Sequence, residues 1–119
     1  MRFSIFSLVI VGLLGLGLGS FVACSSQTEA TVAEIKLPTI QCSSCVNTVS
    51  KALKAEKGVK DVQVDLRGKT AKVTYLTAQT DVSKLEVAVV KSGYAANKKQ
   101  ADPEAYETLA ACCKVSEGH

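Results

Sequence analysis

The chain has 119 residues, with 14 lysines and arginines, 11 aspartates and glutamates, and a formal net charge of +3. This length is enough for one small domain. The basic residues are scattered and are not interleaved with aromatic residues, so the composition gives no support for nucleic-acid binding. The single histidine is His119 at the C-terminus, and no carboxylate pair converges in the sequence. These observations argue against hydrolase or transferase chemistry and predict a protein that is not an enzyme.

Residues 1–23 predict an export signal. Arg2 is the only charged residue before Glu29, and a long apolar stretch rich in Leu, Val and Gly follows it. Small residues then precede Cys24. A short basic start, an apolar region and a small-residue exit are typical of a secretory signal.

Cys24 and the residues before it resemble a bacterial lipobox. That resemblance implies that Cys24 is lipidated and becomes the new N-terminus, with residues 24–30 as a polar tether. We therefore expect a membrane-anchored lipoprotein facing the periplasm or the cell surface. The alternative is an uncleaved anchor helix, because the apolar run approaches the ~20 residues that a membrane span needs.

Apolar periodicity predicts four strands and two helices between residues 31 and 99. Alternation predicts a first strand that ends at Pro38, a hairpin around Arg67-Gly68-Lys69 and a weaker last strand over Tyr94–Lys99. Helical spacing predicts a first helix bearing Val46, Val49 and Leu53, with Ser43 or Ser44 as its N-cap. Ser83-Lys84-Leu85-Glu86 matches a capping box at the start of the second helix, which ends at Gly93.

This order is β-α-β-β-α-β, the split βαβ pattern. It predicts an α+β, ferredoxin-like domain with a four-stranded antiparallel sheet and both helices on one face. Residues 100–119 form a separate C-terminal extension. Asp102 is a good N-cap and Pro103 suits the first helical position, so we expect a short helix from Pro103 to Cys112.

Four of the five cysteines form two close pairs, Cys42/Cys45 and Cys112/Cys113. A disulfide within Cys42–Cys45 would close almost no loop and would restrict the unfolded chain little. The pair therefore indicates chemistry rather than a structural staple. Thiolates are soft ligands that select ions such as Cu(I), Zn(II) and Hg(II). Two thiolates suffice for nearly linear Cu(I) or Hg(II), whereas Zn(II) prefers four ligands.

A cysteine pair at the first strand-to-helix junction of a βαββαβ domain resembles the heavy-metal-associated domain family. The family includes copper chaperones, N-terminal domains of metal-transporting ATPases and periplasmic mercuric-ion-binding proteins. Its motif, Gly-Met-Thr-Cys-x-x-Cys, corresponds here to Thr39-Ile40-Gln41-Cys42-Ser43-Ser44-Cys45. The resemblance covers roughly 31–99. It implies that Ile40 anchors the loop, that Tyr94 lies beside it, and that the metal passes to a metal-transporting membrane protein or another carrier.

The second pair, Cys112-Cys113, is predicted to return to the first. The last strand should start near the metal loop and run ~16 Å away from it. The following helix, ~15 Å long, could bring the pair back to the level of Cys42 and Cys45. We therefore expect a site of three or four thiolates, with His119 as a further candidate ligand. Two alternatives stand beside it: Cys113 packs as an apolar residue, or one of the pair forms a disulfide with Cys42 or Cys45.

Two other functions fit the same cysteines. A thiol-disulfide redox protein would use Cys42 and Cys45 as its reactive pair. A sensor or buffer domain would bind metal and have no transfer partner.

Overall fold

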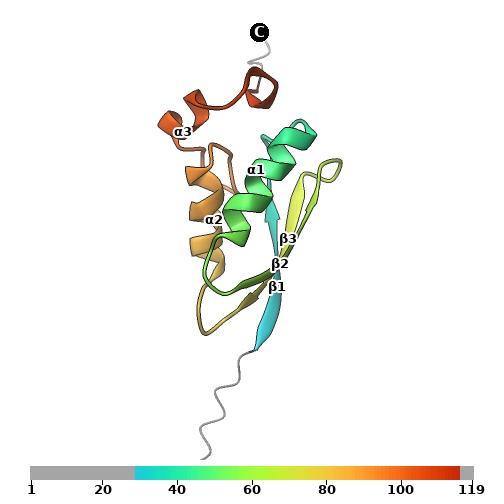
Figure 1. The fold of residues 1–119 in the computed structure, drawn as a ribbon, viewed down its shortest axis with the longest axis vertical. Coiled ribbons are helices and arrows are strands. Elements are labelled where there is room, and N and C mark those ends of the chain that lie inside the picture. The colour runs from blue at the N-terminus through green and yellow to red at the C-terminus, as the bar shows by residue number, and fades with distance from the viewer. Residues whose placement is uncertain (1–28, 116–119) are drawn as a thin grey trace, which may run out of the picture.

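The computed structural model describes residues 29–115, so Cys24 and His119 lie outside the described part of the chain. Its elements are β1 (Ala30–Lys36), α1 (Ser43–Lys54), β2 (Val59–Asp65), β3 (Thr70–Leu76), α2 (Val82–Lys91), α3 (Pro103–Glu107) and the 3-10 helix η1 (Ala111–Cys113). The strands form an antiparallel sheet in the order β1-β3-β2. Both α1 and α2 lie on one face of this sheet (Figure 1). The predicted order is confirmed as far as β-α-β-β-α.

The core lies between the sheet and the two long helices. The apolar residues that alternate along the strands and recur along one helical face are fully buried there: Ile35, Leu37, Val49, Leu53, Val73, Leu85 and Val89. Polar neighbours such as Glu34 and Lys72 stay exposed on the other face of the sheet. Burying each large aliphatic side chain contributes about 1.5–3 kcal/mol. This apolar layer holds α1 against the sheet and so fixes where α1 begins.

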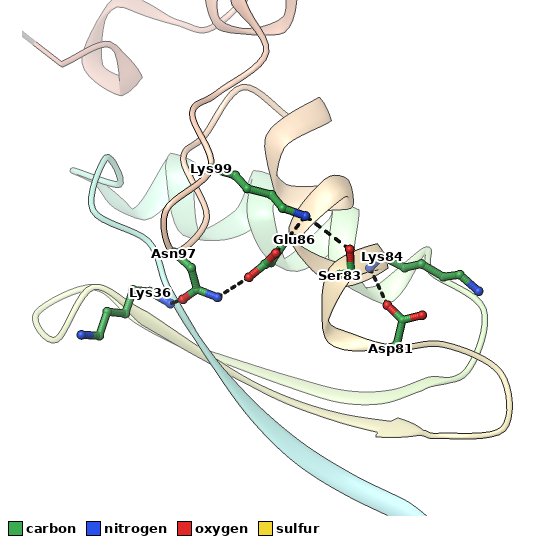
Figure 2. Close-up of polar contacts among 7 residues, drawn as sticks. All are labelled: Lys36, Asp81, Ser83, Lys84, Glu86, Asn97 and Lys99. Carbon is green, nitrogen blue, oxygen red and sulfur yellow. Dashed lines mark hydrogen bonds and ion pairs between the residues drawn. The ribbon is translucent and has the colours of Figure 1, made fainter.

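The fourth strand predicted over Tyr94–Lys99 is wrong in the described structure. Asn97 has a left-handed backbone, with φ of 52°, and the segment turns back on itself in an isolated bridge between Ala96 and Lys99. Asparagine tolerates this conformation because its short side chain hydrogen-bonds locally. The backbone N–H of Asn97 donates to the Lys36 carbonyl at 2.8 Å. In return, the backbone N–H of Lys36 donates to the side-chain oxygen Oδ1 of Asn97 at 2.8 Å (Figure 2). One residue thus takes the place of a strand at the end of β1.

Asn97 also links β1 to α2, through Glu86. Asn97 Nδ2 donates to Glu86 Oε1 at 2.6 Å, and Lys99 Nζ lies 2.9 Å from Glu86 Oε2 (Figure 2). The predicted capping box from Ser83 to Glu86 is therefore wrong. Helix α2 begins two residues earlier than expected, so Asp81 is its N-cap and accepts from Lys84 N at 3.0 Å.

The C-terminal helix is shorter than predicted. Helix α3 ends at Glu107 instead of reaching Cys112. The Thr108 hydroxyl donates to the Ala105 carbonyl at 2.7 Å, a local bond that competes with helix continuation. Ala110 is then extended, and the chain re-forms a single 3-10 turn at the cysteines. Within residues 29–115, no helix combines the length and the apolar character needed to cross a membrane.

Helix α3 packs against the end of α2 at a glycine. Gly93 has φ of +97°, and a Cβ at this position would lie 3.0 Å from the Ala105 carbonyl oxygen. The Asp102 N–H donates to the Val90 carbonyl at 3.1 Å. These contacts place the C-terminal segment at the end of the domain where α1 begins (Figure 1).

Candidate metal centre

The first cysteine pair lies at the start of α1. Cys42 is the N-cap residue with an extended backbone, and its side chain makes no capping hydrogen bond. The predicted caps Ser43 and Ser44 are instead the first two helical residues. Cys45 follows in the first turn, where free backbone N–H groups and the helix dipole favour a thiolate. The sulfur atoms of Cys42 and Cys45 lie 3.3 Å apart.

The second pair meets the first. Cys42 Sγ lies 3.8 Å from Cys112 Sγ and 3.7 Å from Cys113 Sγ, and the last two are 3.9 Å apart. The sulfurs of Cys42, Cys112 and Cys113 all lie within 4.8 Å of one another. None of the four cysteines is in a disulfide. Cys42 is thus the thiol that lies close to all three others.

The four thiols differ in exposure. Cys45 is fully buried and Cys113 is 3% exposed, whereas Cys42 is half-buried and Cys112 is exposed. Cys45 shares a helical face with Val49 and Leu53, so it points into the core. An incoming thiol would therefore meet Cys42 or Cys112 first.

Buried groups around Cys45 favour its thiolate. Burial raises its pKa, but this effect is outweighed by a backbone hydrogen bond from Gln41 and by contacts with Cys113, Tyr94 and Cys42. The net result lowers the Cys45 pKa to about 7. A low pKa means that a large fraction of Cys45 is ionised near neutral pH, and the thiolate is the form that binds metal.

The pKa of Cys113 is shifted in the opposite direction. The hydroxyl of Tyr94 lowers its pKa, but burial and the thiols of Cys45 and Cys42 together raise that pKa to about 11. Burial also raises the pKa of Tyr94, as do the neighbouring Cys113 and Cys45. Of the two buried thiols, Cys45 therefore has the lower pKa and gives up its proton more readily.

The residues expected to support the loop lie beneath it. Ile40 and Tyr94 are both fully buried in the cluster that includes Cys45 and Cys113. The Thr39 hydroxyl accepts a hydrogen bond from the Ala95 N–H at 3.0 Å, which ties the loop to the segment after α2. These contacts anchor the loop to the core, and Cys42 remains partly exposed to solvent.

Sequence reasoning missed one residue that joins the two cysteine segments. The side-chain amide of Gln41 donates to the Lys114 carbonyl at 3.3 Å. Gln41 stands where the family motif has threonine, but nothing in the sequence links it to Lys114, which lies 73 residues away.

Known proteins resemble this chain in sequence and fold. A mercuric transport protein periplasmic component from Pseudomonas aeruginosa is 36% identical over 85 residues, which are 71% of this chain and 92% of that protein. The copper-transporting ATPase 2 of Rhizobium meliloti (strain 1021) is 42% identical over 65 residues, 55% of this chain. The chain spans only 8% of that ATPase. The crystal structure of oxidized MerP from Ralstonia metallidurans CH34 has 35% identity and a TM-score of 0.57, and the match covers 60% of this chain and all of MerP.

The fold and the thiols define a small ferredoxin-like domain for soft metal ions. The heavy-metal-associated domain family matches residues 34–95, and the chain belongs to this family. The resemblance inferred from the cysteine motif is thereby confirmed. The match ends at Ala95, so α3 and Cys112-Cys113 lie outside the matched domain.

Proposed function

We propose that this protein binds Cu(I) or Hg(II) through Cys42 and Cys45 and passes the ion to a metal-transporting membrane protein or another carrier. The observation that carries the proposal is the Cys42–Cys45 pair, with sulfurs 3.3 Å apart at a helix N-terminus. The lowered pKa of Cys45 supplies a thiolate, and half-exposed Cys42 offers a route for ligand exchange. The similarity to a mercuric transport component and to a copper-transporting ATPase supports these two ions.

Metal titration of the purified full chain under reducing conditions tests the proposal. Cys24→Ser should be present in every sample, so that this thiol does not contribute. We expect tight binding of Cu(I) or Hg(II), strongly weakened by Cys42→Ser with Cys45→Ser. The matched control is Ser43→Ala with Ser44→Ala, which changes the two intervening residues and keeps both thiols. Undiminished binding in the double serine variant would contradict the proposal.

The metal-loaded chain should also release its ion to an acceptor. Mixing it with a metal-free heavy-metal-associated domain of a copper- or mercury-transporting membrane protein should move the ion within seconds. A slower, dissociation-limited release, independent of acceptor concentration, would favour a buffer that has no transfer partner.

The redox alternative makes a different prediction. A thiol-disulfide redox protein would reduce insulin disulfides catalytically in the presence of excess reductant. We expect no such turnover above that of the Cys42→Ser variant. Catalytic turnover combined with weak metal binding would replace the metal proposal.

We infer further that the protein is held at the cell envelope by a lipid on Cys24. The motif around Cys24 and the periplasmic relatives support this location. Cys24→Ala should move the protein out of the membrane fraction of a bacterial host if residues 1–23 are otherwise cleaved. A parent protein that stays in the membrane at its full precursor mass, with no lipid on Cys24, would indicate an uncleaved anchor helix instead.

A further inference from the structure

The C-terminal dicysteine brings its sulfurs to Cys42 across a long stretch of chain. Cys112 is 70 residues away from Cys42 in sequence, yet their sulfurs lie 3.8 Å apart. Cys112 is exposed, so apolar burial does not explain why its side chain turns toward Cys42. Core packing accounts for the position of buried Cys113 but not for that of exposed Cys112.

The spacing of the three sulfurs suits one metal ion. A metal–sulfur bond of about 2.3 Å places the sulfurs of a planar three-thiolate site about 4.0 Å apart. The separations among Cys42, Cys112 and Cys113 are 3.7, 3.8 and 3.9 Å. An ion could bind among them with shifts of only a few tenths of an ångström.

The C-terminal segment is held in this position by contacts of its own. Asp102 Oδ1 accepts from the backbone N–H groups of Glu104 and Ala105, at 2.9 and 3.1 Å. Leu109 packs against the core, and the Cys113 N–H donates to the Ala110 carbonyl at 2.8 Å. The bond from Gln41 to the Lys114 carbonyl closes the segment over the loop. Since the thiols are already placed, little ordering entropy opposes metal binding.

A buried polar group also points to a ligand. The Tyr94 hydroxyl is buried and makes no hydrogen bond of acceptable geometry with the described residues, although the thiols of Cys45 and Cys113 lie next to it. A buried unpaired hydroxyl is costly. A metal-bound thiolate at Cys113 would be an acceptor for this hydroxyl and would remove that cost.

We propose that Cys112 and Cys113 join Cys42 in a three-thiolate site for the same soft ion, with buried Cys45 next to Cys42 and exposed Cys112 as the thiol through which the ion enters or leaves. The inference rests on the proposed function, because Cys42 belongs to both sets. Each thiol that binds releases its proton to solvent, and no electrons are exchanged. With Cys112 and Cys113 as ligands, the site has three thiolates instead of two and binds the ion more tightly.

X-ray absorption on the Hg(II)-loaded or Cu(I)-loaded full chain tests this coordination. With Cys24→Ser in all samples, we expect three sulfur ligands per ion. Cys112→Ser with Cys113→Ser should reduce the number to two and weaken binding at least about tenfold. Two sulfurs in the parent protein, or unchanged coordination in the double variant, would overturn the three-thiolate site and leave the proposed function standing.

Two further measurements separate coordination from folding. Cys113 is buried, so its replacement can disturb packing, whereas Cys112→Ser alone changes an exposed position. We expect Cys112→Ser to lower the sulfur number and affinity while the circular dichroism spectrum is unchanged. A disulfide from Cys42 to Cys112 or Cys113, found by mass spectrometry in the metal-loaded protein, would also overturn the proposal. Undiminished binding after Cys42→Ser with Cys45→Ser would contradict the proposed function itself.

Discussion

Tyr94 contributes to the ionisation of the two buried thiols. Its hydroxyl lowers the pKa of both Cys45 and Cys113. We therefore expect Tyr94→Phe to raise the Cys45 pKa above its present value of about 7 and to slow alkylation of the protein at neutral pH. The free energy of unfolding should rise by about 1 kcal/mol, because the lost hydroxyl is buried without a well-formed hydrogen bond. A pH titration of thiolate absorbance measures the first effect.

Tyr75→Phe is the matched control for that experiment. Tyr75 is also buried, but it lies on β3 and does not contribute to the pKa of either thiol. The control should leave the thiol titration unchanged. An identical thiolate titration in Tyr94→Phe and the parent protein would show that the hydroxyl does not act on the thiols.

At the level of single residues, the sequence predicted the features that depend on residues close together in the chain. Cys42 and Cys45 were found because two thiols at a strand-to-helix junction are a short-range pattern. The burial of Cys45 was missed, although Val49 and Leu53 lie four and eight residues after it and mark the same helical face. The contact of Gln41 with Lys114 joins residues far apart in sequence, and no short-range pattern specifies it.

The turn at Asn97 pairs with the end of β1, where the sequence predicted an edge strand. Asn97→Ala removes the side-chain bonds to Lys36 N and Glu86 Oε1 and leaves a Cβ in a left-handed backbone. We expect a loss of about 1 to 3 kcal/mol in the free energy of unfolding, measured by urea denaturation. Asn97→Gly loses the same bonds but accepts the positive φ, so it should be less destabilising by about 1 kcal/mol. Equal losses in both variants would mean that backbone strain plays no part.

Glu86 makes the hydrogen-bonded link between Asn97 and α2 sensitive to acid. The hydrogen bond from Asn97, and then the contacts with Lys99, lower the Glu86 pKa below its ordinary value of 4.5. The unfolded chain therefore binds this proton more readily than the folded one. The stabilisation is complete above pH 4.5 and is lost as the pH falls through the lower folded pKa. We expect Glu86→Gln to reduce the loss of stability below pH 4.5, measured by urea denaturation.

Asn97→Ala offers an independent check of the acid effect. Because the Asn97 amide is the largest cause of the shift, its removal should also make stability less dependent on pH in the same range. If the free energy of unfolding falls with pH in both variants as it does in the parent protein, the loss of stability in acid comes from other carboxylates.

Elements with strong apolar periodicity were predictable, and elements set by one polar residue were not. The strands β1, β2 and β3 and the helices α1 and α2 each bury an alternating or helical set of aliphatic residues. Residues 94–99 contain few such residues, so the left-handed Asn97 decides their path. The early end of α3 likewise depends on the Thr108 hydroxyl, and periodicity gives no warning of it.

The contact of α3 with Gly93 should be sensitive to a single methyl group. Gly93→Ala places a Cβ 3.0 Å from the Ala105 carbonyl and forces alanine into a φ of +97°. We expect a loss of about 1 to 2 kcal/mol in global stability and displacement of α3, seen as faster amide exchange over 103–113. Gly58→Ala is the matched control. It has a similar φ of +94° but lies before β2, against Gln79. Slow exchange at α3 in Gly93→Ala would show that the helix tolerates the methyl group.

For the molecule as a whole, metal binding should couple the C-terminal segment to the domain. An ion held by Cys42, Cys112 and Cys113 ties together residues 70 positions apart, so the segment cannot detach without losing ligands. At a free metal concentration about 100 times the Kd, binding to the folded state adds about 2.7 kcal/mol, less whatever the unfolded thiols bind. We therefore expect the Tm to rise and amide exchange over 103–113 to slow when Cu(I) or Hg(II) is added. In Cys112→Ser with Cys113→Ser, a two-thiolate site should still raise the Tm, but exchange over 103–113 should stay fast, because the ion no longer reaches the segment. Equal slowing of exchange in both proteins would mean that the segment senses metal through the loop and not through its own thiols.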